Sequence, residues 1–442
     1  MPVAWNLLHT PRDPLRSEWP ERAPLDQFRD QRLRELVRHA CARVPYYRQR
    51  LAAAGIDPAR FAGMADLGRI PISRKSDLQG LRASQICAAD VDPARLIRHE
   101  TGGSTGQPFT VRRTFVEERL LNWLRWRAWL AVGGNLRDRT AYVAYVSPVP
   151  EARNWSADIL MALGMCRRQP FDCLRPPEEL LREIVAYQPD ALCGFASSLA
   201  RLALVPRPEL LARLRPHVVL SGGELLTPQV RTLLCDTFAV PVRDFYGAAE
   251  FNLVAWECPH TGVLHTCDEG AIVEVVDEQG QPVPPGGEGE VVGTALHSFA
   301  MPIIRYSLGD VAVRGPACCP CGNQLSVLSR VQGRHLDYFK LADGTLLHPY
   351  RVIELLYLPG MDWVGQYQLI QESASEVRLL VQPRRAVAPG CRDSLEAAVR
   401  ACCGHGAAAT VELVEQIPST AKGKHRVAYS KLEILPAHTE AR

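Results

Sequence analysis

The chain of 442 residues is longer than one hydrophobic core usually serves, which predicts two or three domains and excludes a single small binding module. Hydrophobic residues make up 47% and charged residues 22%, the mixture of a globular chain that can bury a large core. The 51 basic and 48 acidic residues give a net charge of +3, so the composition lacks the one-signed field by which proteins bind nucleic acid or anionic membranes.

No apolar run is long enough to span a membrane, and residues 1–16 lack the apolar core of a signal peptide. We therefore expect a cytoplasmic protein with neither a membrane nor a nucleic acid as partner. In that compartment the 14 cysteines are expected to be reduced, and a cluster of them favours a metal site over a disulfide. Most of the cysteines are scattered, but Cys318, Cys319 and Cys321 form a cluster.

The first elements are helical. Residues 25–54 carry apolar side chains at helical spacing, which predicts an amphipathic helix broken near Pro45. The stretch 115–132 has tryptophans and arginines at helical intervals. This pattern is more typical of a packing face with a solvated edge than of nucleic-acid contact.

From residue 140 to residue 238, short apolar runs alternate with helical patterns. We predict strands at 140–146, 191–195 and 218–221, and helices at 177–186, 199–214 and 228–238. Strand and helix at this spacing favour an α/β layered core with a largely parallel sheet.

From residue 270 onward the sequence pattern is typical of β-structure. Strands at 271–276 and 290–294, with a turn at 278–281, predict antiparallel hairpins. Beyond Gly333 we predict helices at 350–356 and 392–401 and strands at 366–371, 377–381 and 408–414. We therefore expect a large N-terminal α/β domain with a β-rich subdomain over 1–333 and a small C-terminal α+β domain over 334–442.

The first motif that carries chemistry is Thr101-Gly-Gly-Ser-Thr-Gly106. Its glycines and small hydroxyls allow backbone N–H and side-chain O–H groups to converge on phosphate oxygens. It is not the P-loop of kinases, because Gln107 stands where that motif needs a lysine. A plain hairpin turn is the alternative.

The second motif is Ser221-Gly-Gly-Glu224, followed by Phe245-Tyr-Gly-Ala-Ala-Glu250. Paired glycines at a strand end offer a flat backbone surface to a planar ring, and Tyr246 can cover another face of that ring. Glu250 can hold Mg²⁺ through one carboxylate, as that ion usually sits with phosphates. The alternative for Glu250 is a solvated turn glutamate.

Three further motifs follow in order. Asp310, in Arg305-Tyr-Ser-Leu-Gly-Asp310, is expected in a loop, where its carboxylate suits the vicinal hydroxyls of a ribose. Gly333 lies where the composition changes, and it is either a hinge or an ordinary turn. Lys422 and Lys424, two of only five lysines, lie in Pro418-Ser-Thr-Ala-Lys-Gly-Lys424, a loop that can bring an ammonium to a developing phosphate charge or form a solvated turn.

In this order and at these separations, the five motifs resemble those of the adenylate-forming ligases. Within them the chain is similar to the phenylacetate–CoA ligase family and its capsule-biosynthesis adenylyltransferase-like relatives, by Val44-Pro-Tyr-Tyr-Arg48, Ile70-Pro-Ile-Ser-Arg-Lys75 and Gly194-Phe-Ala-Ser-Ser-Leu-Ala200. The similarity extends over residues 28–432. It implies ATP-dependent activation of a carboxylic acid to an acyl-adenylate, then transfer to a thiol, usually that of coenzyme A, with release of AMP.

The resemblance also implies roles for individual residues. Ser104, Thr105 and Gly106 would contact the phosphates. Gly222, Gly223 and Glu224 would lie beside adenine, with Tyr246 stacked over it. Asp310 would bind the ribose, and Gly247 and Arg334 would be further nucleotide contacts. Glu250 would bind Mg²⁺, and Lys424 would bridge the carboxylate and the α-phosphate during adenylation. The small domain would be a mobile lid that rotates about residues near Gly333.

Two features depart from the family pattern. The phosphate loop lacks the lysine frequent at its end, which predicts a slower first step. Leu336 occupies the fourth position of the Gly-Arg hinge motif, with Asp337 next, so the hinge residue stays open. Whether Lys422 shares the role of Lys424 is also open.

The cysteine cluster is explained by the same resemblance. Family members carry Cys, His and then Cys-Pro-Cys, which correspond to Cys258, His265, Cys319 and Cys321. Such a set suits a closed tetrahedral zinc site, and since no residue in it leaves an open position we expect a structural rather than a catalytic Zn²⁺. A zinc-ribbon module that binds nucleic acid is the alternative, disfavoured because no basic patch accompanies the cluster.

The substrates are less defined than the reaction. Candidates for lining the acid pocket are Trp155, Phe195, Ser197 and Ser221, a mixture that allows a hydroxylated aryl acid without requiring one. An acyl-carrier protein or an amine could replace coenzyme A as acceptor, and a non-catalytic nucleotide-binding protein is a remote alternative. Both a monomer and a homodimer are compatible with the sequence.

Overall fold

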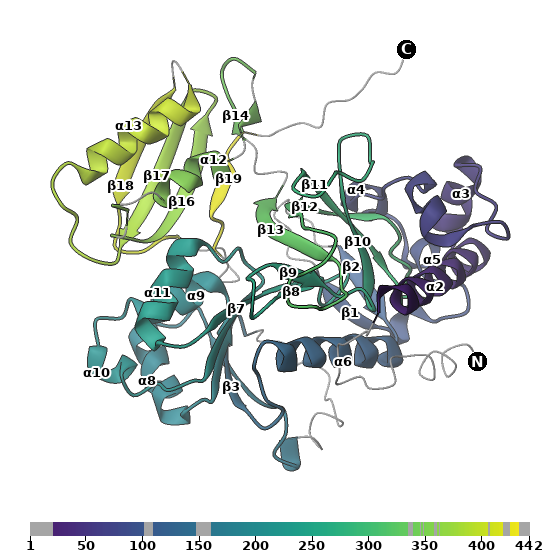
Figure 1. Cartoon of the computed structure of the whole chain (residues 1–442), viewed down its shortest axis with the longest axis horizontal. Helices are drawn as coiled ribbons and strands as arrows, with labels where there is room; N and C mark the ends of the chain where they lie inside the picture. Colours follow the sequence, from purple (N-terminus) through teal and green to yellow (C-terminus); the bar gives the residue numbers. More distant parts are fainter. Residues whose placement is uncertain are drawn as a thin grey trace. The chain divides into compact units, whose positions relative to one another are not determined.

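The computed structural model describes residues 21–100, 109–146, 161–334, 339–344, 346–347, 349–357, 360–361, 363–404, 407–418 and 425–432. The chain forms two compact units, one made of Met1–Asn135 and Phe245–Gln332, the other of Leu136–Asp244 and Gly333–Arg442. Figure 1 shows the elements coloured along the sequence. The boundary at Gln332 lies beside the one expected from composition. The division into 1–333 and 334–442 stays a prediction.

The first unit begins with helices whose breaks follow the sequence. Helices α2 (Arg22–Arg43) and α3 (Pro45–Ala53) confirm the helix predicted to break near Pro45. Val44 is extended because a residue before proline avoids the helical region. The buried face of α2 packs against strand β10 (Ala271–Val276) through Ile272.

Helix α6 (Phe115–Ala131) confirms the helix predicted at 115–132. Thr114 caps it, since its hydroxyl accepts from Glu117 N while the Glu117 carboxylate accepts from Thr114 N. Two short strands, β1 (Ile97–Glu100) and β2 (Thr110–Arg113), pair antiparallel just before this helix. The shorter helices of this unit are η1 (Gly63–Arg69), α4 (Lys75–Leu78), α5 (Ala83–Ile86) and η2 (Pro93–Arg95).

The β-rich part of the first unit confirms the predicted hairpins. Strand β10 pairs antiparallel with β11 (Glu288–Ala295), and β11 pairs antiparallel with β12 (Tyr306–Arg314). The strand order continues through β13 (Val327–Arg334), β9 (Leu264–Thr266) and β8 (Ala255–Glu257) to the end of β7 (Val242–Tyr246). Apolar side chains from these strands fill the core beneath the sheet.

The second unit contains the predicted parallel sheet. Strands β6 (Val218–Gly222), β5 (Ala191–Gly194), β3 (Arg139–Ala144) and β4 (Arg167–Asp172) are neighbours in that order, and each adjacent pair is parallel. Helices α8 (Pro177–Tyr187) and α11 (Pro228–Phe238) match their predicted ranges and pack on the sheet. The mixed α/β fold expected from the sequence is therefore confirmed.

One predicted helix of this unit is wrong. The range 199–214 is divided into α9 (Ala196–Ala203) and α10 (Pro208–Leu211). Pro206 and Pro208 cause the break, because a proline lacks the backbone N–H and disfavours helical geometry in the residue before it.

The C-terminal segment of the second unit forms a four-stranded sheet. Its order is β18 (Ala408–Leu413), β17 (Glu376–Pro383), β16 (Val364–Ser373) and β19 (Ala428–Ser430). Helix α13 (Cys391–Cys403) packs on it, and β14 (Phe339–Lys340), β15 (Leu346–Leu347), α12 (Tyr350–Ile353) and η4 (Glu354–Tyr357) precede it. The expected α+β composition is confirmed.

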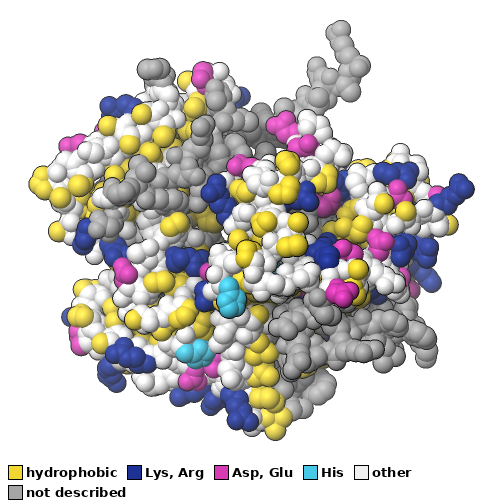
Figure 2. All heavy atoms as spheres, viewed as in Figure 1, with side chains coloured by type: hydrophobic (Ala, Val, Ile, Leu, Met, Phe, Trp, Pro, Cys, Tyr) yellow, Lys and Arg dark blue, Asp and Glu magenta, His cyan; other side chains and the backbone are white. Residues whose placement is uncertain are grey.

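Two properties of the described residues bear on partners. No helix among them is both long enough and apolar enough to cross a membrane. Figure 2 shows basic and acidic side chains interspersed over the face in view.

Candidate active site and metal cluster

A tight turn follows strand β7 and carries the residues expected to contact nucleotide. Phe251 N and Asn252 N both donate to Ala248 O, and Val254 N donates to Tyr246 O. A Cβ at Gly247 would lie 2.7 Å from the carbonyl oxygen of Asn252. Glycine is therefore required at position 247 by the close approach of the returning backbone.

Tyr246 and Asp310 meet at the end of β7. The Tyr246 hydroxyl donates a hydrogen bond to Asp310 Oδ2 at 2.6 Å. The expectation that Asp310 lies in a loop is wrong, because the residue belongs to β12. The strand bulges there: Glu290 pairs with Val311 but Val292 pairs with Ser307, and Gly309 between them has φ +74°. A bulge re-aims the side chains that it carries.

Glu250 lies at the end of the same turn. Glu250 is only 8% exposed, so the alternative interpretation as a solvated turn residue is wrong. The negative charge of Glu250 is one of those that act on the Arg113 guanidinium, which also donates to the carbonyl of Ala249, the residue before Glu250. Within the described part of the chain, no hydrogen bond engages the Glu250 carboxylate. A carboxylate held in a turn without a donor fits a hard cation such as Mg²⁺.

Arg113 belongs to a network that the sequence did not reveal. Its Nη1 lies 3.3 Å from Glu118 Oε2, and His99 Nε2 lies 2.9 Å from the same oxygen. Burial alone would raise the pKa of Glu118, but the bonds from His99 and Arg113 together lower it to about 2. Glu118 is thus ionised and holds both strands of the β1–β2 hairpin.

The hairpin frames the predicted phosphate loop. Glu100 pairs with Thr110, so residues 101–109 connect two antiparallel strands. Ser104, Thr105 and Gly106 themselves lie outside the described residues.

A second group of predicted residues lies at the ends of β5 and β6. Gly194 pairs with Ser221 in the parallel register, which brings Phe195 beside the end of β6. Ser221 is fully buried, and its hydroxyl has no hydrogen-bond partner among the described residues. Gly223 has φ +80°, a conformation that favours glycine and turns the chain sharply after Gly222.

Glu224 is engaged by protein groups. Its carboxylate accepts from Ser197 N at 2.9 Å and from Ser197 Oγ at 3.1 Å. The backbone amide of His425 donates to the same carboxylate. Ser197, a candidate for the acid pocket, thus already donates its hydroxyl to Glu224.

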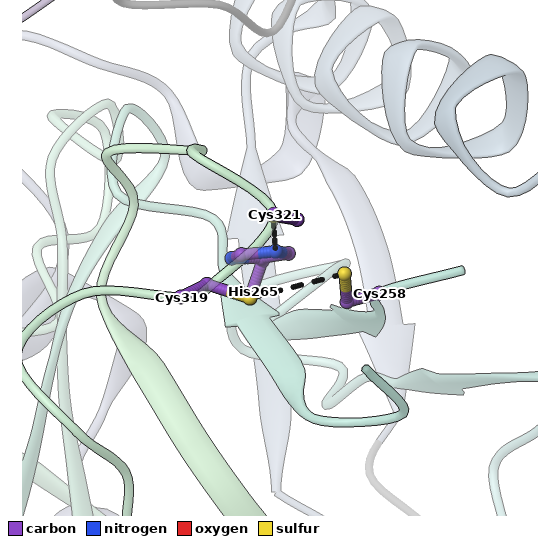
Figure 3. A group of neighbouring side chains, drawn as sticks. All are labelled: Cys258, His265, Cys319 and Cys321. Carbon is purple, nitrogen blue, oxygen red and sulfur yellow. Dashed lines mark hydrogen bonds between the residues drawn. The ribbon is translucent and has the colours of Figure 1, made fainter. Parts of the chain in front are cut away.

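The four residues expected to hold zinc do come together. Ligand atoms of Cys258, His265, Cys319 and Cys321 all lie within 4.8 Å of one another, and Figure 3 shows their side chains converging. The Sγ atoms of Cys258 and Cys319 are 3.9 Å apart, and Cys321 Sγ is 3.3 Å from His265 Nε2. Zn–S bonds of about 2.3 Å in a tetrahedron place sulfur atoms about 3.8 Å apart, so this donor set fits Zn²⁺.

The surroundings of the cluster suit a closed site. Burial lowers the pKa of His265, which keeps its imidazole neutral and able to donate a lone pair to a metal. Thr261 Oγ1 lies 3.3 Å from Cys319 Sγ, and Asn323 N donates to Cys321 Sγ at 3.4 Å. Cys318, next to the cluster in sequence, is exposed and does not belong to it.

Several predicted residues are not placed. Trp155, Lys422, Lys424, Leu336 and Asp337 lie outside the described residues. The backbone of Arg334 ends strand β13.

Sequence reasoning missed functional contacts whose partners are distant. Arg113 and Ala249 are 136 residues apart, and Glu224 and His425 are 201 residues apart. No local pattern marks such pairs. The one usable signal was the position of Arg113 in a strand directly beside the predicted phosphate loop.

Comparison with known proteins places this geometry in a family. The model of the AMP-binding enzyme family matches residues 71–295, just over half of the chain. The phenylacetate-coenzyme A ligase of Thermus thermophilus is 26% identical over 362 residues, which cover 79% of this chain and 78% of that protein. The phenylacetate-coenzyme A ligase of Aromatoleum evansii is 26% identical, with 76% and 77% covered.

Solved structures show the same fold. The 2-hydroxyisobutyryl-CoA ligase in its postadenylation state with 2-HIB-AMP aligns with a TM-score of 0.77 at 23% identity, covering 96% of this chain and 94% of that one. Anthranilate CoA ligase in complex with anthranoyl-AMP aligns with a TM-score of 0.55 at 16% identity, with 76% and 67% covered. By its match to the family model, this chain belongs to the AMP-binding enzymes.

Proposed function

We propose that this protein is an AMP-forming acid–CoA ligase. In the first step a carboxylate oxygen of the acid attacks the α-phosphorus of ATP, and the bond to pyrophosphate breaks. In the second step the sulfur of coenzyme A attacks the acyl carbon, and AMP leaves. The products are an acyl-CoA thioester, AMP and pyrophosphate.

The observation that carries the proposal is the turn after β7. Tyr246, just before the turn, is hydrogen-bonded to Asp310, and the turn carries the buried Glu250 next to Ala249, whose carbonyl accepts from Arg113. An aromatic face, a ribose-binding carboxylate and a cation-binding carboxylate within one compact region are what an adenylate-forming site needs. The curated relatives, named as phenylacetate-coenzyme A ligases and aligned over most of their length, support the same reaction.

The nucleotide contacts follow the resemblance. Tyr246 stacks on adenine beside Gly222, Gly223 and Glu224, Asp310 accepts from the ribose hydroxyls, and Gly247 allows the backbone to approach. Ser104, Thr105 and Gly106 donate to the phosphates, with Arg334 as a further contact. The β1–β2 hairpin, fixed through Glu118, supports this loop at its base.

Charge stabilisation in the first step is assigned to Glu250 and Lys424. Glu250 would hold Mg²⁺, which supplies positive charge to the phosphate oxygens. Lys424 would place its ammonium between the acid carboxylate and the α-phosphate. Preorganised charges of this kind are typically worth about 3–4 kcal/mol each in a transition state.

The division into 1–333 and a mobile lid over 334–442 belongs to the same proposal. The lid would rotate about residues near Gly333 between an adenylating and a thioester-forming pose. The φ of +118° at Gly333 supports a hinge, because that conformation is open to glycine and rare for other residues.

The metal cluster is assigned a structural zinc held by Cys258, His265, Cys319 and Cys321. It would pin the loop after Cys258 to the segment around Cys319 and so fix the β-rich part of the first unit. The acid is assigned to the aryl or small acyl class. Phe195 supports a pocket that takes an apolar body with one polar group, as does the buried Ser221 hydroxyl, which has no hydrogen-bond partner among the described residues.

Acid-dependent ATP–pyrophosphate exchange tests the proposal. A panel of aryl, hydroxy and short-chain acids is expected to contain at least one that drives exchange, and mass spectrometry then identifies the product formed with coenzyme A. A product only with an amine or with carrier-protein pantetheine would change the acceptor and keep the adenylation. Exchange with no acid in the panel would overturn the assignment in favour of a non-catalytic nucleotide-binding protein.

A further inference from the structure

The carboxylate of Glu224 joins two parts of the second unit that are distant in sequence. One part is the start of α9, where Ser197 donates to it through both N and Oγ. The other is His425, just before β19, whose backbone amide donates to Oε1. A single side chain therefore connects the β6–α9 region to the C-terminal segment.

His425 is held on its other side by the C-terminal sheet. Its Nε2 lies 2.9 Å from the carbonyl oxygen of Tyr367, and since a carbonyl only accepts, Nε2 carries the proton. Burial lowers the pKa of His425 to about 4, so the ring is neutral near pH 7. Leu369 N donates to Val427 O two residues further on. The backbone at His425 is thus fixed against β16 and against Glu224 at once.

The residue before His425 is Lys424, to which the proposed function assigns the charge stabilisation of the first step. We propose that Glu224 is a positioning residue for adenylation: by binding the N–H of His425, it sets where the backbone of the lysine loop ends and the reach of the Lys424 ammonium. This inference rests on the proposed function, because it assigns Glu224 to the step in which Lys424 acts.

A carboxylate is required at position 224. Ser197 N and His425 N are backbone groups that can only donate, and they donate to different oxygens of Glu224. A glutamine at this position has one carbonyl oxygen, so its NH₂ group would face one of the two N–H groups. Glu224→Gln therefore keeps the shape of the side chain and breaks one of the two backbone contacts.

Another hydrogen bond joins the same two parts of the unit and supplies a control. Gln229 Nε2, in α11, donates to Leu356 O at 2.5 Å. This bond also runs from a side chain to a backbone group of the C-terminal segment, but it is far in sequence from Lys424. Gln229→Leu therefore tests the loss of a docking contact without a change beside the lysine loop.

The experiment measures the two half-reactions separately in the wild type, Glu224→Gln, Glu224→Ala and Gln229→Leu. The first is acid-dependent ATP–pyrophosphate exchange, and the second is thioester formation from synthetic acyl-adenylate and coenzyme A. We expect the kcat of exchange to fall about 10- to 100-fold in Glu224→Gln and further in Glu224→Ala, because small misplacements of a catalytic group cost this much. Both carboxylate oxygens of Glu224 already accept from protein N–H groups, so its contact beside adenine would be made by the backbone. The KM for ATP should therefore stay within about 2-fold, and thioester formation should fall far less than exchange.

A readout independent of activity accompanies the kinetics. Hydrogen exchange of the peptide containing His425 should be faster in Glu224→Ala than in the wild type or in Gln229→Leu, because the His425 amide loses its acceptor there. The residual thioester activity shows that the variants fold.

Three outcomes would overturn the inference. Exchange at the wild-type rate in Glu224→Ala would show that the contact does not position Lys424. A raised KM for ATP, with both half-reactions lowered equally, would show that the Glu224 side chain serves nucleotide binding and does not position Lys424. If Gln229→Leu lowers exchange as selectively as Glu224→Gln does, Glu224 is only one of several contacts that hold the C-terminal segment. If the wild type itself shows no exchange with any acid, the proposed function fails together with the inference, which distinguishes that case from the other three.

Discussion

The hydroxyl of Tyr246 donates a hydrogen bond of 2.6 Å to Oδ2 of Asp310, although 64 residues separate them. The bond joins the last residue of β7 to the bulge in β12. The residue expected to stack on adenine therefore also orients the carboxylate expected to bind the ribose.

Removing this hydroxyl should weaken nucleotide binding. In Tyr246→Phe the ring remains and Asp310 loses a donor, and a hydrogen bond to a charged group is worth about 1.5–3 kcal/mol. We expect the KM for ATP in the exchange reaction to rise about 10-fold or more, with a smaller change in kcat. Tyr187→Phe, at the end of α8, is the matched control because Tyr187 has no proposed role in the site. An unchanged KM in Tyr246→Phe would contradict the orienting role.

The metal cluster gives a prediction that needs no substrate. Metal analysis of the purified protein should find one zinc per chain, and Cys319→Ser should lose it, because three remaining ligands no longer close the tetrahedron. Loss of the metal should lower the thermal midpoint of unfolding, since binding energy at a structural site is folding energy. Cys318→Ser changes the exposed neighbouring cysteine and should keep both the zinc and the midpoint. Equal zinc loss in both variants would argue against the assigned ligand set.

The Arg113–Glu118–His99 network predicts a pH dependence of stability. The pKa of Glu118 is lowered to about 2 from an ordinary value of 4.5, so its stabilising charge is fully present above about pH 4.5 and is lost as the pH falls towards 2. At neutral pH, Glu118→Gln should lower the free energy of unfolding by about 3 kcal/mol, and the difference from the wild type should shrink across that window.

Urea unfolding at several pH values measures this difference. Glu183→Gln is the control, since Glu183 pairs with Arg175 at the surface and exposed ion pairs contribute little. A difference between the wild type and Glu118→Gln that stays constant from pH 7 to pH 2 would contradict the ionised, paired state of Glu118.

Local signals in the sequence predicted most elements of the fold. The break at Pro45 and the cap at Thr114 follow from properties of single residues, and both helices were placed within a few residues. The helix predicted over 199–214 failed because apolar periodicity continues across two prolines that end it. The strand around Asp310 is not predictable from its own residues, because a bulged strand is defined by its pairing partner, here β11.

The site divides in the same way. The zinc ligands were predictable because cysteine and histidine in that pattern are chemically specific, and the structure brings the same four together. The contacts of Arg113 with Ala249 and of Glu224 with His425 were not predictable, because each joins a side chain to a backbone group that carries no residue-specific signal.

The lysine loop gives the most direct test of the proposed chemistry. Lys424→Ala should lower acid-dependent ATP–pyrophosphate exchange at least 10²- to 10³-fold, because the charge that develops on the α-phosphate loses its preorganised partner. Thioester formation from preformed acyl-adenylate should be spared, since that step forms no bond to phosphorus. Lys431→Ala is a control: Lys431 is half-exposed and pairs with Glu372 beyond the loop, so both half-reactions should persist. A stronger loss in Lys422→Ala than in Lys424→Ala would move the role to Lys422, and unchanged exchange in both would leave the first step without its assigned cation.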